Sequence, residues 1–177
     1  MNKNIQRVCL VAIPAVVTLF SGLLLSGCGK AVETITEKAI ESEMGGDADV
    51  DIDSTTGQVS MKMNHEGNEV SMEAGESVSL PADMPADVPL PDGVTWNLVQ
   101  NTTGESNGFI LQGTVDTAMA DLAATLRTKI EAQGWESVQN ISQAGAMEMM
   151  TYSKGEKTLT YNLATDGGKT TVMIALG

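Results

Sequence analysis

The chain has 177 residues, enough for one domain or for one domain with an extension, and its 23 acidic and 10 basic side chains give a formal net charge of −13. A surface of this charge repels phosphate backbones and anionic lipid headgroups, so it excludes nucleic acid as a partner and membrane binding through charge. A single histidine and two cysteines leave few candidates for a catalytic base or nucleophile.

The first 27 residues have the order of a secretory signal peptide. Lys3 and Arg7 precede an almost wholly apolar run over residues 8–25, and Ser26-Gly27 supply small residues directly before Cys28. The run is near the length that crosses a bilayer, so a retained membrane anchor is the alternative. The small residues at its end favour cleavage and predict a mature chain that begins at Cys28.

The tetrapeptide Leu25-Ser26-Gly27-Cys28 resembles the lipobox of bacterial lipoproteins. The resemblance implies signal cleavage between Gly27 and Cys28, an S-diacylglycerol and an N-acyl group on Cys28, and a location in the cell envelope. Several acyl chains on one residue anchor a protein stably, whereas one chain does so only marginally. Gly29, in place of an aspartate after the lipidated cysteine, implies the periplasmic face of the outer membrane.

The mature chain is more acidic than the precursor and has no free thiol. Cleavage removes Lys3 and Arg7 but no acidic residue, which leaves a net charge of −15. Cys9 departs with the signal peptide and Cys28 is acylated, so no disulfide can form, even in an oxidising compartment.

Residues 28–46 predict a lipidated tether with a short helix. Over residues 30–44, apolar side chains recur at helical spacing among glutamates, and Gly45-Gly46 ends the pattern. The apolar positions are Val32, Ile35, Ala39, Ile40 and Met44. We favour a tether beside the membrane over a helix that binds a partner.

Residues 47–80 predict a small β-meander of three or four strands. From Asp47 to Asp53, aspartates alternate with Ala48, Val50 and Ile52, as in a strand with one acidic and one apolar face. The aspartates do not fit the ligand spacing of an EF-hand loop. We interpret them as an acidic edge that discourages aggregation, with weak cation binding as the alternative.

Met61, Met63 and His65 alternate along this meander and therefore share one strand face. Thioethers and imidazole are suitable ligands for Cu(I), which makes these residues a candidate metal site. Val59 lies on the same face, however, and methionine is an adaptable filler of apolar cores. We therefore favour core packing, so that no cofactor beyond the covalent lipid is expected.

Residues 81–93 contain four prolines and predict a stiff, extended linker. Residues 94–177 then predict an α+β domain of order ββαββββ, an antiparallel sheet with one packed helix. Its helix, residues 117–133, would begin after Asp116 and end at Gly134. The predicted strands are 94–101, 109–115, 135–142, 146–153, 157–165 and 169–176.

The lead-in from Pro81 to Pro89, in which prolines and aspartates recur, precedes two strands and a helix that ends in Gly134-Trp135. This arrangement resembles a group of small exported bacterial lipoproteins of unknown function. The resemblance covers most of residues 47–177 and implies no catalytic residues.

Residues 104–108 fit the G-x-S-x-G pattern around Ser106. That pattern serves hydrolases where it links a strand to a helix, whereas here it links two predicted strands. We therefore predict no enzyme. The leading hypothesis is a membrane-anchored scaffold or interaction module that binds another envelope protein, and the alternative is a lipoprotein that binds Cu(I) or a small ligand between helix and sheet.

Overall fold

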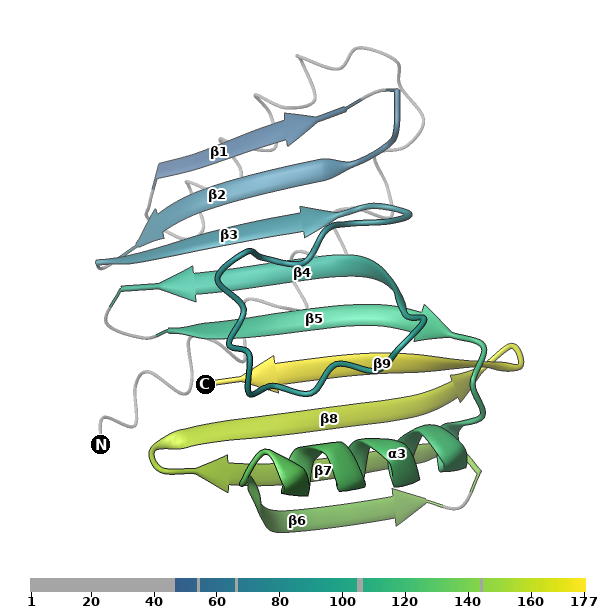
Figure 1. Cartoon of the computed structure of the whole chain (residues 1–177). Coiled ribbons are helices and arrows are strands. Elements are labelled where there is room, and N and C mark those ends of the chain that lie inside the picture. Colours follow the sequence, from purple (N-terminus) through teal and green to yellow (C-terminus); the bar gives the residue numbers. More distant parts are fainter. Residues whose placement is uncertain (1–46, 54, 66, 105–106, 144) are drawn as a thin grey trace.

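The computed structural model describes residues 47–53, 55–65, 67–104, 107–143 and 145–177. This part of the chain forms one antiparallel sheet of nine strands with one helix, α3 (Met119–Ala132) (Figure 1). The strands are β1 (Asp47–Ile52), β2 (Val59–His65), β3 (Asn68–Ala74), β4 (Thr95–Thr103), β5 (Gly108–Val115), β6 (Glu136–Gln143), β7 (Met147–Lys154), β8 (Lys157–Asp166) and β9 (Lys169–Leu176). The predicted signal peptide, the lipidation site Cys28 and the tether helix lie outside the described residues.

The strands lie in the order β1-β2-β3-β4-β5-β9-β8-β7-β6. After β5 the chain passes through α3 to the far edge of the sheet and returns through β7 and β8, so that β9 closes against β5 (Figure 1). Gly167 and Gly168 form the two-residue turn between β8 and β9, with φ of 56° and 85°. A type I′ turn requires positive φ at both positions, which glycine adopts without strain.

The predicted helix is confirmed, and it ends in a Schellman motif. The backbone N–H of Trp135 donates to the carbonyl of Ile130, and that of Gly134 donates to the carbonyl of Glu131. Gly134 has a φ of 80°, which this motif requires after the last helical residue. Asp116 does not cap the helix, because the N-cap is Ala118, without a side-chain hydrogen bond. Leu122, Ala123, Leu126 and Ile130 are buried against the sheet, as the helical spacing predicts.

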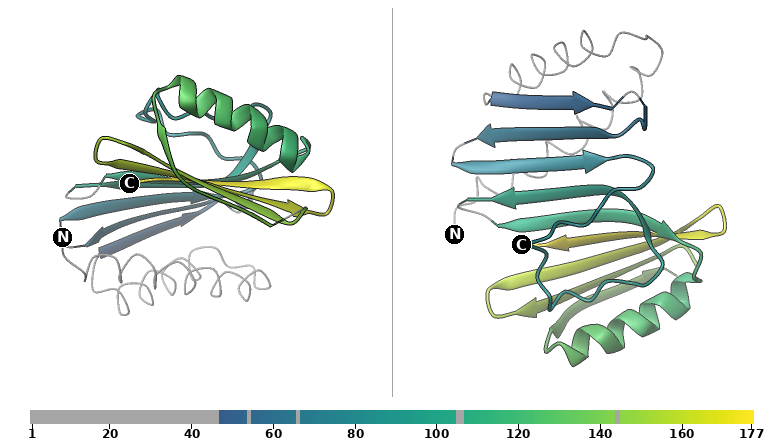
Figure 2. Two further views of the ribbon diagram at one scale, coloured as in Figure 1. Left: turned by 90° about the horizontal axis from the view of Figure 1, so that it is seen from below. Right: turned by 45° about the horizontal axis from the view of Figure 1, so that its top comes forward.

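The prediction of an α+β fold is wrong, because the described chain is mainly β. The segment predicted as a separate meander joins the same sheet, since β3 pairs with β4 over six residues, from Glu69 opposite Thr103 to Ala74 opposite Leu98. Backbone pairing of this kind leaves no signature in the local pattern of either strand. The sheet therefore runs without a break from β1 to β6, and α3 covers only one end of it (Figure 2).

Residues 75–94, which we call the strap, include the segment predicted as a linker. The strap crosses the sheet on the same side as α3 (Figure 2). Val78 and Val88 are buried in the core that the helix and sheet form, and Leu80, Met84 and Leu90 are packed against it. The predicted extended conformation is wrong, because the backbone N–H groups of Met84 and Val88 donate to the carbonyls of Pro81 and Pro85 and form turns. The apolar side chains of the segment make it part of the core.

The two halves of the sheet are apolar on opposite faces. On the face that carries α3, the register row from Asp51 through Ser60 and Glu73 is polar. The same row turns apolar at Val99 and Leu111 and continues into the main core. On the other face, which we call the far face, Val50, Val59, Met61 and Met72 form a second buried cluster.

Candidate functional site

Met61 and Met63, from the candidate copper site, lie on the same face of β2, as predicted. Met61 is 6% exposed and stands opposite Met72 of β3 in the second cluster, while Met63 is partly buried beside it. His65 ends β2, and its side chain lies outside the described part. The arrangement places two thioethers next to each other in an apolar environment, which is typical of methionines that pack in a hydrophobic core.

The other motifs from the sequence lie at turns. β4 and β5 are antiparallel neighbours, so the G-x-S-x-G segment connects the two strands of a hairpin, and Ser106 itself is not among the described residues. The Asp53 carboxylate accepts hydrogen bonds from the backbone N–H groups of Thr55 and Thr56, at 2.8 Å and 3.3 Å. These hydrogen bonds lower the pKa of Asp53 and account for its role as a turn residue.

The most unusual surface of the described chain is the edge strand β6. It pairs with β7 alone, and all eight of its residues are exposed. Its outer side therefore presents a row of backbone N–H and C=O groups without a neighbouring strand in the described structure. The three exposed large apolar side chains of the described chain gather here: Val138 and Ile141 on β6, 63% and 42% exposed, and Met147 on β7, 37% exposed.

The opposite edge, β1, has the protection that β6 lacks. Asp49 and Asp51 are exposed and lie between apolar residues, so that this edge carries negative charge along its length. Charged side chains and prolines are common devices against strand addition at sheet edges. β6 contains no proline and a single charged residue, Glu136, at its first position. Only one of the two edges is therefore suited to receive another strand.

An ion pair between α3 and β7 lies next to β6, with its carboxylate buried and its guanidinium partly exposed. Glu148 of β7 is 6% exposed, stands opposite Ser142 of β6 and pairs with the guanidinium of Arg127 on α3. A buried carboxylate without a partner is costly, so this contact ties the helix to the strand that supports the edge. β6 is exposed, and the strand that pairs with it is linked to α3 by this ion pair.

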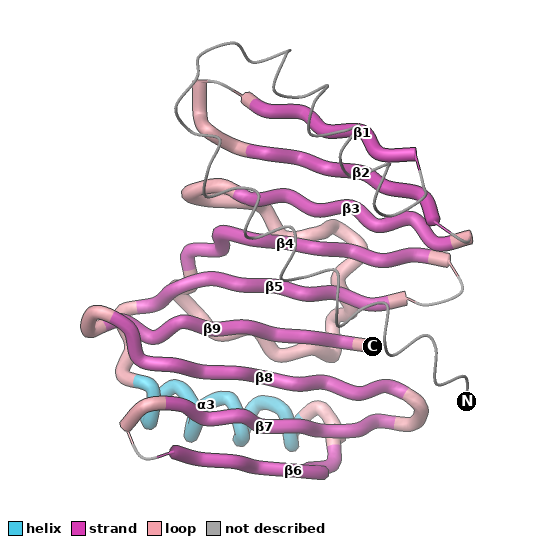
Figure 3. The backbone as a smooth tube through the Cα atoms, turned by 180° about the vertical axis from the view of Figure 1, so that it is seen from behind, coloured by secondary structure: helices cyan, strands magenta, loops and turns pink. Residues whose placement is uncertain are grey.

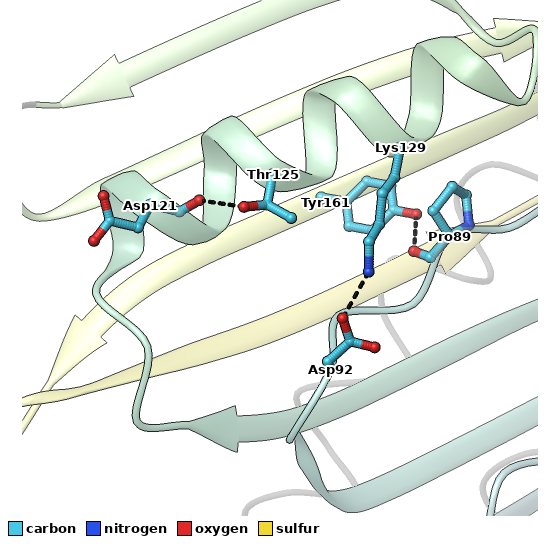
Figure 4. Close-up of polar contacts among 6 residues, drawn as sticks. All are labelled: Pro89, Asp92, Asp121, Thr125, Lys129 and Tyr161. Carbon is cyan, nitrogen blue, oxygen red and sulfur yellow. Dashed lines mark hydrogen bonds and ion pairs between the residues drawn. The ribbon is translucent and has the colours of Figure 1, made fainter.

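The strap is held by three hydrogen bonds at its centre. The Trp135 indole N–H donates to the carbonyl of Asp87 at 2.7 Å. The Tyr161 hydroxyl donates to the carbonyl of Pro89 at 2.7 Å, as Figure 4 shows. The Lys154 ammonium donates to the Asp87 carboxylate at 2.8 Å. This hydrogen bond lowers the pKa of Asp87, whereas burial raises the pKa of Tyr161.

A shallow groove of about 520 Å³ lies between the strap and the C-terminal end of α3. Its walls include apolar side chains such as Met84 and Leu90, together with Lys129. The Lys129 ammonium is held by the carboxylate of Asp92 at 2.8 Å (Figure 4). The groove is open to solvent and differs from the cleft predicted between helix and sheet, where Leu126 and Leu163 are fully buried.

Two further findings apply to the described residues. No helix among them is long and apolar enough to cross a bilayer. They also contain no cluster of three or more His, Cys, Asp or Glu side chains placed to hold a metal ion.

The candidate site leaves no clear signal in the sequence. The predicted strand at residues 135–142 lies close to the observed β6, but nothing in its pattern singles out Val138 or Ile141. A surface strand has a weak apolar alternation, and only the order of strands in the sheet shows that β6 is an edge.

Comparison with protein-family models, with curated proteins and with solved structures gives no significant match for this chain.

Proposed function

We propose that this protein is a lipid-anchored envelope protein without catalytic activity, and that its strand β6 binds an extended segment of a partner protein by strand addition. The observation that carries the proposal is the open edge of β6, with its eight exposed residues and its exposed Val138 and Ile141. In strand addition, main-chain hydrogen bonds supply affinity and alternate side chains supply specificity.

The position of β6 supports this role. Nine strands at the usual spacing of about 4.8 Å place β6 about 38 Å from β1 across the sheet. The chain between the proposed lipid on Cys28 and the sheet arrives at β1. The lipid would therefore hold the protein at one edge of the sheet, and the other edge would face the partner.

The charge of the protein indicates the chemistry of this partner. A mature chain of net charge −15 repels an acidic segment before contact, so the added strand is expected to be neutral or basic. It is also expected to carry apolar side chains that cover Val138 and Ile141.

The test is photo-crosslinking in native membranes from a crosslinker placed at Val138 of the lipidated protein. We expect one distinct adduct, which is lost in Ile141→Lys because a lysine on an edge strand disfavours strand addition. Thr158→Lys is the matched control, since Thr158 is an exposed residue of β8 and receives the same charge. Equal adducts in both variants, or adducts with bulk envelope proteins alone, would contradict the proposal.

Anchoring is tested separately. Cys28→Ser is expected to lose palmitate labelling, and to be released from the membrane or to stay unprocessed. Labelling that persists in this variant would show that the lipid is not on Cys28.

Cu(I) binding is the second candidate, because Met61 and Met72 stand opposite each other and Met63 lies on the same face. It is tested by titrating the purified protein with Cu(I) under reducing conditions. The Met61→Leu/Met63→Leu variant is expected to lose affinity if these thioethers are ligands, and unchanged affinity would eliminate the site.

A further inference from the structure

The second apolar cluster lies on a face that the described elements leave uncovered. Val50, Val59, Met61 and Met72 are between 4% and 9% exposed. α3 and the strap both lie on the other side of the sheet, where they cover the main core (Figure 2). Figure 3 shows the nine strands from behind, with α3 beyond them. Something other than the described elements must cover the cluster.

The cluster is uncharged over three strands. The far-face row Val50–Met61–Met72 is continued on β1 to β3 by Ala48, Ile52, Met63, Val70 and Ala74. The charged residues of these strands, such as Asp51, Lys62 and Glu73, alternate with them and lie on the opposite face. An apolar area of this kind fits an apolar stripe on another element, and not a polar or charged surface.

We propose that residues 30–44 of the chain form the amphipathic helix that covers this far-face cluster. Gly45-Gly46 connect this segment directly to β1, which is next to the cluster. A helix of 15 residues is about 22 Å long, and a strand of seven residues is about 23 Å long, so the lengths match. The apolar positions Val32, Ile35 and Ala39 lie on one side of such a helix.

The same segment is poorly suited to the membrane surface. Helices that lie on membranes usually carry lysine and arginine on their polar face. Residues 30–44 carry four glutamates and two lysines. The segment is therefore the second layer of the fold and not a free tether, so that the chain leaves Cys28 with little slack before the sheet begins. This inference is independent of whether β6 binds a partner.

The experiment uses the lipidated protein in native membranes, in which Cys28 is blocked by its lipid and two introduced cysteines are the only thiols. A short bis-maleimide is expected to link Ala39→Cys to Met61→Cys within one chain. Glu41→Cys paired with Met61→Cys is the matched control, because residues 39 and 41 lie on nearly opposite sides of a helix. We expect at least about tenfold less product for this control, because only a held pair has a high effective concentration.

A second control pairs Ala39→Cys with Thr160→Cys, which lies on the same far-face row but beneath the other half of the sheet. Little product is expected there. Equal yields for residues 39 and 41 would overturn the inference. Links between two differently tagged copies would assign the cluster to a second copy, and links from Met61→Cys to another protein would assign it to a partner. Either result would also overturn the inference.

Discussion

The hydrogen bond from the Tyr161 hydroxyl to the Pro89 carbonyl joins the strap to strand β8. Its contribution to the free energy of unfolding can be measured. The Tyr161 side chain is fully buried on β8, and its hydroxyl donates to the Pro89 carbonyl at 2.7 Å. Tyr161→Phe removes this donor and leaves the carbonyl without it. Loss of one buried hydrogen bond of this kind costs about 1–2 kcal/mol in free energy of unfolding.

For a domain of this size, a loss of 1 kcal/mol corresponds to a fall of about 4 °C in Tm. Tyr152→Phe is the matched control, because Tyr152 is also buried, at 2% exposure, but its hydroxyl donates to the weak acceptor Sδ of Met150, at 3.9 Å. We expect this control to lose clearly less stability than Tyr161→Phe.

The assay is urea denaturation of both variants at neutral pH, followed by circular dichroism and checked by thermal melting. Equal midpoints for Tyr161→Phe and the wild type, at an unchanged m-value, would refute the reasoning. They would show that this hydrogen bond contributes nothing to the stability of the fold.

Three further predictions concern the core, the charges and one glycine. Leu126→Ala removes a side chain with no exposed surface between α3 and the sheet and is expected to cost about 3 kcal/mol, measured by urea denaturation. Lys154→Met removes a partly exposed partner of Asp87 and is expected to cost about 1 kcal/mol at pH 7. Because the Asp87 pKa is lowered in the folded state, its contribution is complete above pH 3.8, its ordinary value, and is lost as pH falls through the lowered pKa. The difference between Lys154→Met and wild type should therefore shrink in acid, and a constant difference would contradict this assignment. Gly113→Ala places a Cβ 2.6 Å from the Thr95 carbonyl oxygen and is expected to lower stability by about 1–3 kcal/mol or to disturb β4, visible as a lower Tm.

The local elements of this protein could be predicted from its sequence because their signals are short-range. The helix was predicted from apolar residues at helical spacing and from the stop at Gly134, and the structure has it at Met119–Ala132. The turn at Gly167-Gly168 lies where the predicted strands 157–165 and 169–176 leave a short connection, and both glycines have positive φ. These features depend on residues within one or two turns of each other, where backbone geometry and side-chain spacing decide the outcome.

The pairing of distant segments was decided by the tertiary structure alone. β9 lies between β5 and β8, and β3 pairs with β4 although the strap separates them in the chain. Backbone hydrogen bonds between strands are the same for any sequence, so the local pattern does not reveal which strands are neighbours. The prolines of residues 81–93 predict a linker, yet Val88 is buried because the sheet presents an apolar face beneath it. The sequence likewise predicts a strand close to residues 136–143. Only the order of strands in the assembled sheet makes that strand, with its exposed Val138 and Ile141, an open edge.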